Sequence, residues 1–215
     1  MRSLTMLLTL VSVTMLGCSL DASDLNASDY VQRGVDNIKQ GEYDKAISNN
    51  DIAIKMDPSL AGAYLNRAIA YSEKGEYERA LSDYSKSIEL DPKEEKAYYN
   101  RGTGYIAKDD YDRALADFDM AIELSPDYAM AYINRGLTHQ IRGHHDRAFA
   151  DLSKAIKLNP SNGQFYFIRG VAYEHLGEFH LALDDYKRAL ELDHYDAEAE
   201  HERVSAIVGI LEWGK

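Results

Sequence analysis

The stretch that decides the fold runs from residue 61 to 94 and reads AGAYLNRAIAYSEKGEYERALSDYSKSIELDPKE. It contains one of the four prolines of the 215-residue chain, and each proline follows the one before by 34 positions: Pro58, Pro92, Pro126 and Pro160. Alignment on these prolines gives five units without insertion, at 27–60, 61–94, 95–128, 129–162 and 163–196. A strict period of this length is typical of stacked units that each contain two helices.

Several columns of these units hold one kind of side chain. When each unit is numbered from one to 34, position four is always tyrosine, position eight is glycine or alanine, and position 20 is alanine. Positions 4, 8 and 11 share one face of a first helix, and positions 20, 24 and 27 share one face of a second. Small residues let the two helices approach closely, while large ones such as Tyr84 and Phe118 fill the space around them. The chain is therefore predicted to be all-α.

This pattern resembles the tetratricopeptide repeat, which has a large residue at position four, small residues at eight, 20 and 27, and proline at 32. The resemblance covers residues 27–196, or 170 of 215. It implies a right-handed superhelical solenoid of five 34-residue helix-turn-helix repeats, whose function lies in the groove that the repeats form. Residues 197–215 are expected to form a C-terminal capping helix and tail, with Val204 and Ile207 on its apolar face.

Position seven departs from the family pattern, in which leucine is usual. It is arginine in all five units, and position 23 is aspartate in four units and Asn49 in the first. Both columns should face the partner helix, where a lone charge is costly. We therefore predict a structural ion-pair ladder of Arg67 with Asp83, Arg101 with Asp117, Arg135 with Asp151, and Arg169 with Asp185. The alternative is an arginine row that binds an acidic ligand.

Family geometry implies that positions five, six and nine of the first helices face a concave groove. The expected partner-binding residues there are Val31, Leu65, Asn66, Tyr99, Asn100, Ile133, Asn134 and Phe167. Amides donate and accept together, so an asparagine row suits the backbone of an extended segment, and apolar neighbours suit its side chains. We expect a peptide or a partner's helix in this groove. At position nine, Thr103 and Leu137 can belong either to the groove or to the core between repeats.

The first residues resemble an export signal. Arg2 precedes an uncharged run from Ser3 to Leu20 that contains the only cysteine, in Leu16-Gly17-Cys18-Ser19. This looks like a bacterial lipoprotein signal, in which the chain is cut before the cysteine and the thiol carries lipid. The prediction is a signal peptide at 1–17, then a lipidated Cys18 and polar tether at 18–26. An ordinary signal peptide and an uncleaved membrane anchor are the alternatives.

Charge and histidine placement limit the classes of partner. The formal net charge of −12 argues against nucleic acid. The seven histidines all lie in the C-terminal half, at His139, His144, His145, His175, His180, His194 and His201. Their spacings match no metal-ligand motif, so neither a metal nor a cofactor is expected.

These observations predict a non-enzymatic adaptor of the bacterial cell envelope, of the kind that assists pilus secretin assembly or recruits peptidoglycan hydrolases. Its partners would be envelope proteins, with no small-molecule substrate. Ser19 after the cysteine favours an outer-membrane anchor facing the periplasm. Two other functions are kept open, a metal-dependent envelope enzyme that uses the histidines and a self-associating structural scaffold.

Overall fold

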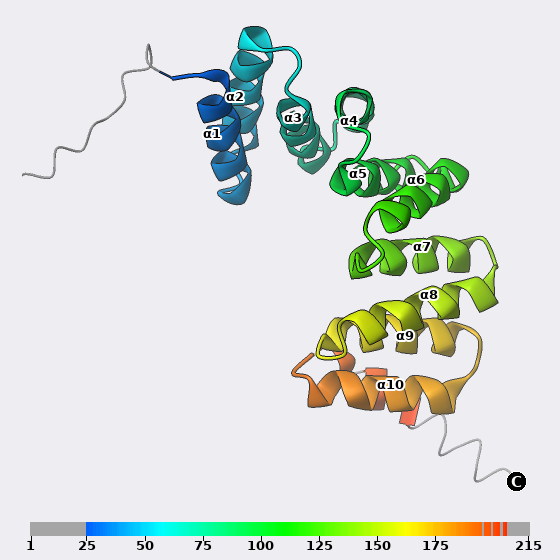
Figure 1. Ribbon diagram of the computed structural model, residues 1–215. Helices are drawn as coiled ribbons and strands as arrows, with labels where there is room; N and C mark the ends of the chain where they lie inside the picture. The colour runs from blue at the N-terminus through cyan, green and yellow to red at the C-terminus, as the bar shows by residue number, and fades with distance from the viewer. Residues whose placement is uncertain (1–24, 195, 199, 203, 206–215) are drawn as a thin grey trace, which may run out of the picture.

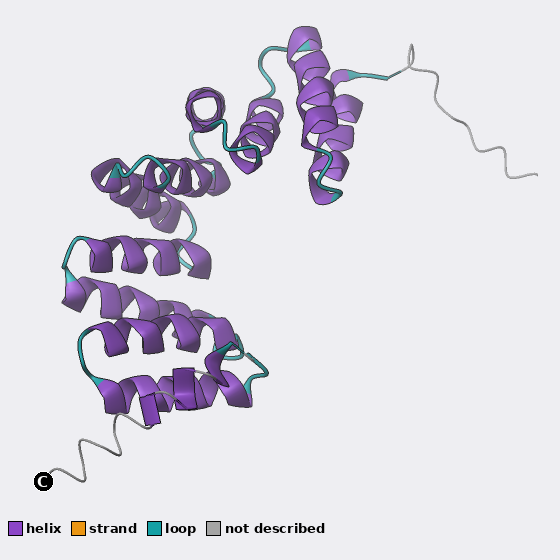
Figure 2. Ribbon diagram, turned by 180° about the vertical axis from the view of Figure 1, so that it is seen from behind, coloured by secondary structure: helices purple, strands orange, loops and turns teal. Residues whose placement is uncertain are grey.

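The computed structural model describes residues 25–194, 196–198, 200–202 and 204–205, and Figure 1 shows them as helix pairs that follow one another along a curved path. The helices are α1 (Ala27–Lys39), α2 (Tyr43–Met56), α3 (Ala61–Glu73), α4 (Tyr77–Leu90), α5 (Glu95–Ile106), α6 (Tyr111–Leu124), α7 (Ala129–Ile141), α8 (His145–Leu158), α9 (Gly163–His175) and α10 (Phe179–Glu191). Figure 2 shows only helices and loops in the described chain. The predicted all-α solenoid of helix-turn-helix repeats is confirmed.

The turn between the two helices of a repeat needs one residue with a left-handed backbone. Four repeats place glycine there, with φ between 73° and 77°: Gly41, Gly75, Gly143 and Gly177. The third repeat uses Asp109 at φ 59°, and its carboxylate accepts a hydrogen bond from the Tyr111 hydroxyl at 2.8 Å. Aspartate tolerates this region better than most residues. The backbone bond from Asp110 N to Tyr105 O, 2.9 Å, closes the turn as its equivalents do in the other repeats.

The core within each repeat depends on close approach of its two helices. The alanines at position 20 are almost fully buried, and the residue at position eight lies directly against the large side chain at position 24. A Cβ atom on Gly102 would lie 2.8 Å from the Phe118 ring, and one on Gly170 would lie 2.7 Å from the Tyr186 ring. A Cβ atom at these two contacts would therefore require the neighbouring buried ring to shift, which a closely packed core resists.

The first repeat has a polar residue at the same core position. Asn50 is fully buried where the other repeats have Tyr84, Phe118, Leu152 and Tyr186. Its Nδ2 donates to the carbonyl of Ala46 at 2.8 Å, but its Oδ1 has no hydrogen-bond partner among the described atoms. A buried acceptor without a partner costs about 1–3 kcal/mol, so Asn50 should stabilise its repeat less than the large apolar side chains at this position stabilise theirs.

The C-terminal end of the stack is covered by residues after α10. The described residues within 197–205 are helical where assigned, and Ala197 and Val204 are fully buried against Ala182, Tyr186 and Ala189. The remainder of the predicted cap, 206–215, lies outside the described residues. So do residues 1–24, which include Cys18. Within the described chain, no helix has both the length and the apolar character needed to span a bilayer.

Candidate partner-binding site

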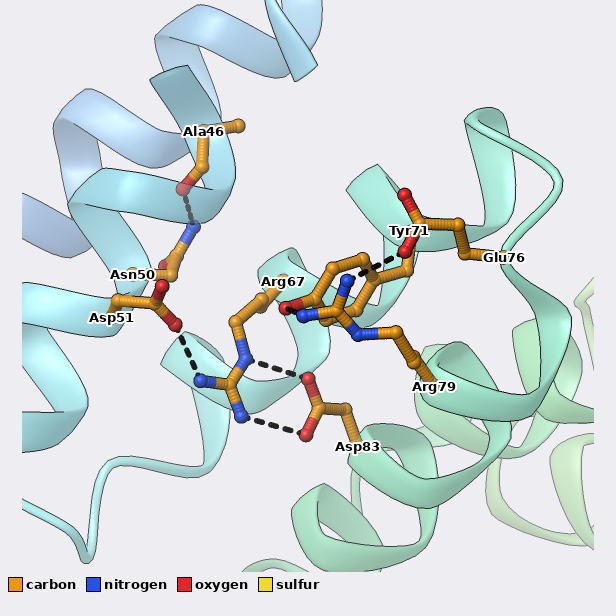
Figure 3. A network of polar contacts seen from close by, with 8 residues as sticks. All are labelled: Ala46, Asn50, Asp51, Arg67, Tyr71, Glu76, Arg79 and Asp83. Atoms are coloured by element: carbon orange, nitrogen blue, oxygen red, sulfur yellow. Dashed lines mark hydrogen bonds and ion pairs between the residues drawn. The ribbon is translucent and has the colours of Figure 1, made fainter. Parts of the chain in front are cut away.

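The arginine and aspartate columns meet inside each of the last four repeats. Arg67 donates from Nε to Asp83 Oδ2 at 2.7 Å and from Nη2 to Asp83 Oδ1 at 2.8 Å, as Figure 3 shows. The pairs Arg101–Asp117, Arg135–Asp151 and Arg169–Asp185 repeat this two-pronged geometry, with distances of 2.7–2.8 Å. The arginine side chains are 19–20 % exposed and the aspartates 7–10 %. The Nε and Nη2 donors of each guanidinium, which could otherwise bind an acidic ligand, are therefore already occupied by the aspartate.

Each of these arginines also contacts the repeat before it. Nη1 of Arg67 donates to Asp51 at 2.5 Å, and Nη1 of Arg135 donates to Asp119 at 2.6 Å. In the alternate repeats the acceptor is a serine hydroxyl, Ser85 for Arg101 and Ser153 for Arg169. The hydrogen bond to its own aspartate is the largest cause that raises the pKa of each arginine, against the opposing effect of burial. The ladder thus joins neighbouring repeats, a role that the column pattern did not reveal.

The first repeat lacks this arrangement. Arg33 forms no ion pair within the described residues, and its guanidinium carbon lies 5.7 Å from the centre of the Tyr30 ring. Asn49, which stands in the aspartate column, directs Nδ2 to Asn37 Oδ1 at 2.8 Å and to the Lys45 carbonyl at 3.0 Å. A cavity of about 490 Å³ lies beside Arg33, lined also by Asn37, Ser48 and Asn49 among others.

A second set of ion pairs joins consecutive repeats at their turn edge. A cation at position 14 contacts an acid at position 18 of the repeat before, at 2.5–3.2 Å: Lys74–Asp44, Lys108–Glu78 and Arg142–Asp112. In the fifth repeat Leu176 replaces the cation opposite Asp146. These pairs were not predicted from the sequence, although their constant spacing of 30 residues is a signal that the sequence contains.

The predicted groove residues divide into core and surface. Leu65 and Ile133 are 8 % and 1 % exposed, so the assignment of these two to the groove is wrong. They pack in the cores of the second and fourth repeats because neighbouring side chains cover position five there. Six predicted residues keep partial exposure, namely Val31, Asn66, Tyr99, Asn100, Asn134 and Phe167.

The asparagine row is only partly open to a ligand. Asn134 Nδ2 donates to the Tyr99 hydroxyl at 3.1 Å and to Thr103 Oγ1 at 3.4 Å. Tyr99 packs against Tyr128 with ring centres 4.9 Å apart, and burial raises the pKa of its hydroxyl. Among the described atoms, the side-chain amides of Asn66 and Asn100 have no hydrogen-bond partner. These two amides therefore remain available to a ligand, whereas the Asn134 amide forms hydrogen bonds from repeat four to repeat three.

An apolar cavity opens between α7 and α9. Its volume is about 460 Å³, and its lining comes from positions 5, 6, 9, 12 and 13, the columns expected on the concave face: Leu137, Gln140, Ile141, Phe167, Ile168, Val171 and His175. The first helices α1, α3, α5 and α7 contact one another in succession, as helices on the inner side of a curved stack do. Phe167 was predicted here. Ile168 was not predicted as a site residue, although it replaces the asparagine that repeats two to four have at position six. Leu137 lies both at the edge of the core and in the cavity.

The histidines do not gather into a metal centre in the part of the chain that the structure describes, where no cluster of three His, Cys, Asp or Glu side chains is close enough to hold an ion. His139 is buried, and its Nδ1 lies 3.4 Å from Nδ1 of His144. Burial lowers the pKa of His139. His175 lines the apolar cavity instead.

Comparisons with known proteins agree with this architecture. Two family models of the tetratricopeptide repeat match, one at residues 61–94 and 164–196 and the other at 102–169. No protein with a curated description matches the sequence. The crystal structure of MamA is 30 % identical and superposes with a TM-score of 0.67, covering 77 % of this chain and 96 % of that one.

Two more distant structures share the fold. A tetratricopeptide protein of Thermus thermophilus, TTC0263, is 23 % identical with a TM-score of 0.68, over 84 % of this chain and 99 % of its own. YrrB, described as having an unusual peptide-binding site, is 22 % identical with a TM-score of 0.66, over 82 % of this chain and 92 % of its own.

Proposed function

The chain belongs to the tetratricopeptide repeat family, and from that premise we propose that it is a membrane-tethered adaptor which gathers proteins of the bacterial cell envelope. The fold itself supports a protein–protein interaction role, and proteins of this family are generally non-enzymatic scaffolds. The proposal adds a location, an anchor and a binding surface.

The observation that carries the proposal is the apolar cavity between α7 and α9. Concave, mostly apolar cavities with a few polar groups are the usual sites of ligand side chains. Here Ile141 is 59 % exposed at the rim, while Gln140 and His175 supply the polar groups. An exposed apolar rim next to an apolar cavity suits the apolar face of a partner helix, which inserts side chains spaced three or four residues apart.

In-cell photo-crosslinking from a probe at Gln140, followed by mass spectrometry, tests this surface. We expect a discrete adduct with an envelope protein. Ile168→Asn, which introduces the residue that repeats two to four carry in this column, should weaken the adduct by roughly tenfold because the cavity loses part of its apolar lining. The matched control is Asn66→Ala, which should leave the adduct in place. Loss of the adduct with Asn66→Ala but not with Ile168→Asn would move the site to the middle repeats.

The anchor is supported by the sequence alone. Cys18 is the only thiol in the chain and follows a short apolar run, and residues 18–26 would connect the lipid to α1. Metabolic labelling with a palmitate analogue tests this. The expected result is label on the wild-type protein and none on Cys18→Ser, which should also leave the membrane fraction. Label that persists on Cys18→Ser would contradict the anchor.

A further inference from the structure

The turn edge of the fifth repeat is apolar where the other repeats are basic. Position 14 is a cation in repeats two to four, and position 19 is a cation in repeats one to four: Lys74, Lys108, Arg142, Lys45, Arg79, Arg113 and Arg147. The fifth repeat has leucine in both columns. Leu176 is 41 % exposed and Leu181 is 46 % exposed. Two apolar side chains therefore face solvent where the other repeats have cations.

The second repeat shows what these cations contact. Lys74 Nζ lies 3.3 Å from Glu76 Oε1 and 2.5 Å from Asp44 Oδ1. Arg79 Nη1 lies 2.6 Å from Glu76 Oε2, the pair that Figure 3 also draws. The four positions thus form one cluster, in which two cations neutralise an acid of the same repeat and an acid of the repeat before.

The fifth repeat keeps the acids of this cluster and loses both cations. Glu178 is the equivalent of Glu76, and Asp146 of repeat four is the equivalent of Asp44. Both are exposed, and neither carboxylate forms an ion pair or a hydrogen bond with another residue that the structure describes. The edge therefore combines two exposed leucines with two carboxylates that lack a bound cation. A surface that is both apolar and basic would be complementary to it.

This edge adjoins the apolar cavity between α7 and α9. His175, which directly precedes Leu176, lines the cavity, and so does Ile141. Phe167 in the cavity is nine residues before Leu176, a distance of about 13 Å along a helix. A partner helix covers that distance in about two and a half turns and presents apolar residues three or four positions apart. One helix can therefore contact the cavity and Leu176 together.

We infer that the segment which occupies this surface is a basic amphipathic helix. The inference rests on the proposed function, because it takes the same cavity as the binding surface and adds the chemistry of the occupant. The apolar stripe of the helix continues from the cavity over Leu176 and Leu181, and its lysine or arginine side chains pair with Asp146 and Glu178. An acidic segment or an anionic lipid surface would be repelled by these carboxylates and by the net charge of −12.

The photo-crosslinking probe at Gln140 tests the inference, with the yield of its adduct as the readout. Asp146→Asn together with Glu178→Gln should lower the yield about two- to fivefold, because charges at the rim of an interface act mainly on the rate of association. Lysine at both positions should lower it about tenfold or more, since attraction becomes repulsion. The matched control is Asp44→Asn with Glu76→Gln, the same change in repeats one and two, which should leave the yield unchanged.

Leu176→Lys tests the apolar part of the surface without weakening the fold. It should lower the yield about tenfold, because it removes an apolar contact and supplies Asp146 with a cation from its own chain, as Lys74 does for Asp44. Leu176→Gln, which supplies no cation, should lower the yield less. Once mass spectrometry has identified the crosslinked segment, glutamate in place of its basic residues should restore the adduct of the variant with lysine at 146 and 178.

The outcomes separate this inference from the proposed function. A yield that is insensitive to both charge variants would leave the cavity as the binding surface and overturn the basic helix. A yield that rises with lysine at 146 and 178 would assign an acidic partner instead. An adduct with a second copy of this chain, or no adduct from Gln140 at all, would contradict the proposed function and the inference with it.

Discussion

Arg101 and Asp117 lie sixteen residues apart and form a two-pronged ion pair with both bonds at 2.8 Å, at the interface between α5 and α6. The Asp117 side chain is only 7 % exposed, and Nη1 of Arg101 reaches Ser85 of the repeat before. The pair therefore joins two helices of one repeat and also two repeats.

We expect Asp117→Leu to lower the free energy of unfolding by about 2–4 kcal/mol, because it leaves the Arg101 charge partly buried without its partner. Arg101→Leu should be similarly destabilising. The double substitution should recover most of the loss, since two apolar side chains pack at the same interface without an unpaired charge. Urea unfolding of the four proteins measures this cycle. Additive losses would mean that the two charges do not depend on each other.

Asn50→Leu should stabilise the first repeat by roughly 1–2 kcal/mol. The substitution removes a buried acceptor that lacks a partner, and Leu152 already occupies this position against Gly136 in repeat four. Slower hydrogen exchange in α1 and α2 would report the gain. The reverse change, Leu152→Asn, is the matched control and should destabilise repeat four. If Asn50→Leu is instead destabilising, the amide has a role in this repeat other than packing.

Leu176→Lys should restore, between repeats four and five, the ion pair that the other repeats form at their turn edge. Lysine at this position would face Asp146 as Lys108 faces Glu78, at an exposed site. The expected gain in melting temperature is small and should disappear in about 1 M salt, where the screening length falls to about 3 Å. Leu176→Gln, which adds polarity without charge, is the control. A gain that survives high salt would indicate removal of an exposed apolar group rather than a new ion pair.

Acid should destabilise the fourth repeat through His139. Burial is the largest effect, and it lowers the pKa of His139 in the folded state. Asp151 opposes this shift, while Arg135, Arg147 and His144 lower the pKa further. The unfolded state then binds the proton more readily, so the contribution to stability is present above the ordinary pKa near 6.5 and is lost as the pH falls below it.

His139→Tyr tests this pH dependence. Tyrosine occupies the same column in Tyr71, Tyr105 and Tyr173, so the substitution suits the repeat. Melting temperatures recorded between pH 7.5 and 5.5 should fall less for the variant than for the wild type. Equal slopes would show that another group carries the acid sensitivity.

Repeat periodicity made several tertiary contacts predictable. Because every repeat places position seven opposite position 23, the pairing of Arg67 with Asp83 and of Arg169 with Asp185 could be inferred from spacing. The ion pairs between repeats, such as Lys74 with Asp44, follow the same periodicity. To predict such a contact, however, one must know how one repeat is offset against the next. That offset is not a property of a single repeat.

Exposure within one column was not predictable. Ile133 and Phe167 both occupy position five, yet the first is 1 % exposed and the second lines the apolar cavity. Asn100 and Asn134 both occupy position six, yet only Asn134 bonds to the repeat before it. Each outcome depends on the size and chemistry of side chains contributed by the adjacent repeat.

The amino-acid sequence by itself determined the two-helix unit, its turns and the ion pairs inside it, because these follow from local periodicity and from residues a fixed number of positions apart. The tertiary structure alone decided where the inner surface is closed by Ile133 and where it opens between α7 and α9. The physical reason is that the accessible surface of a solenoid depends on how neighbouring repeats pack, and small differences in side-chain volume at that junction either bury a position or leave a cavity.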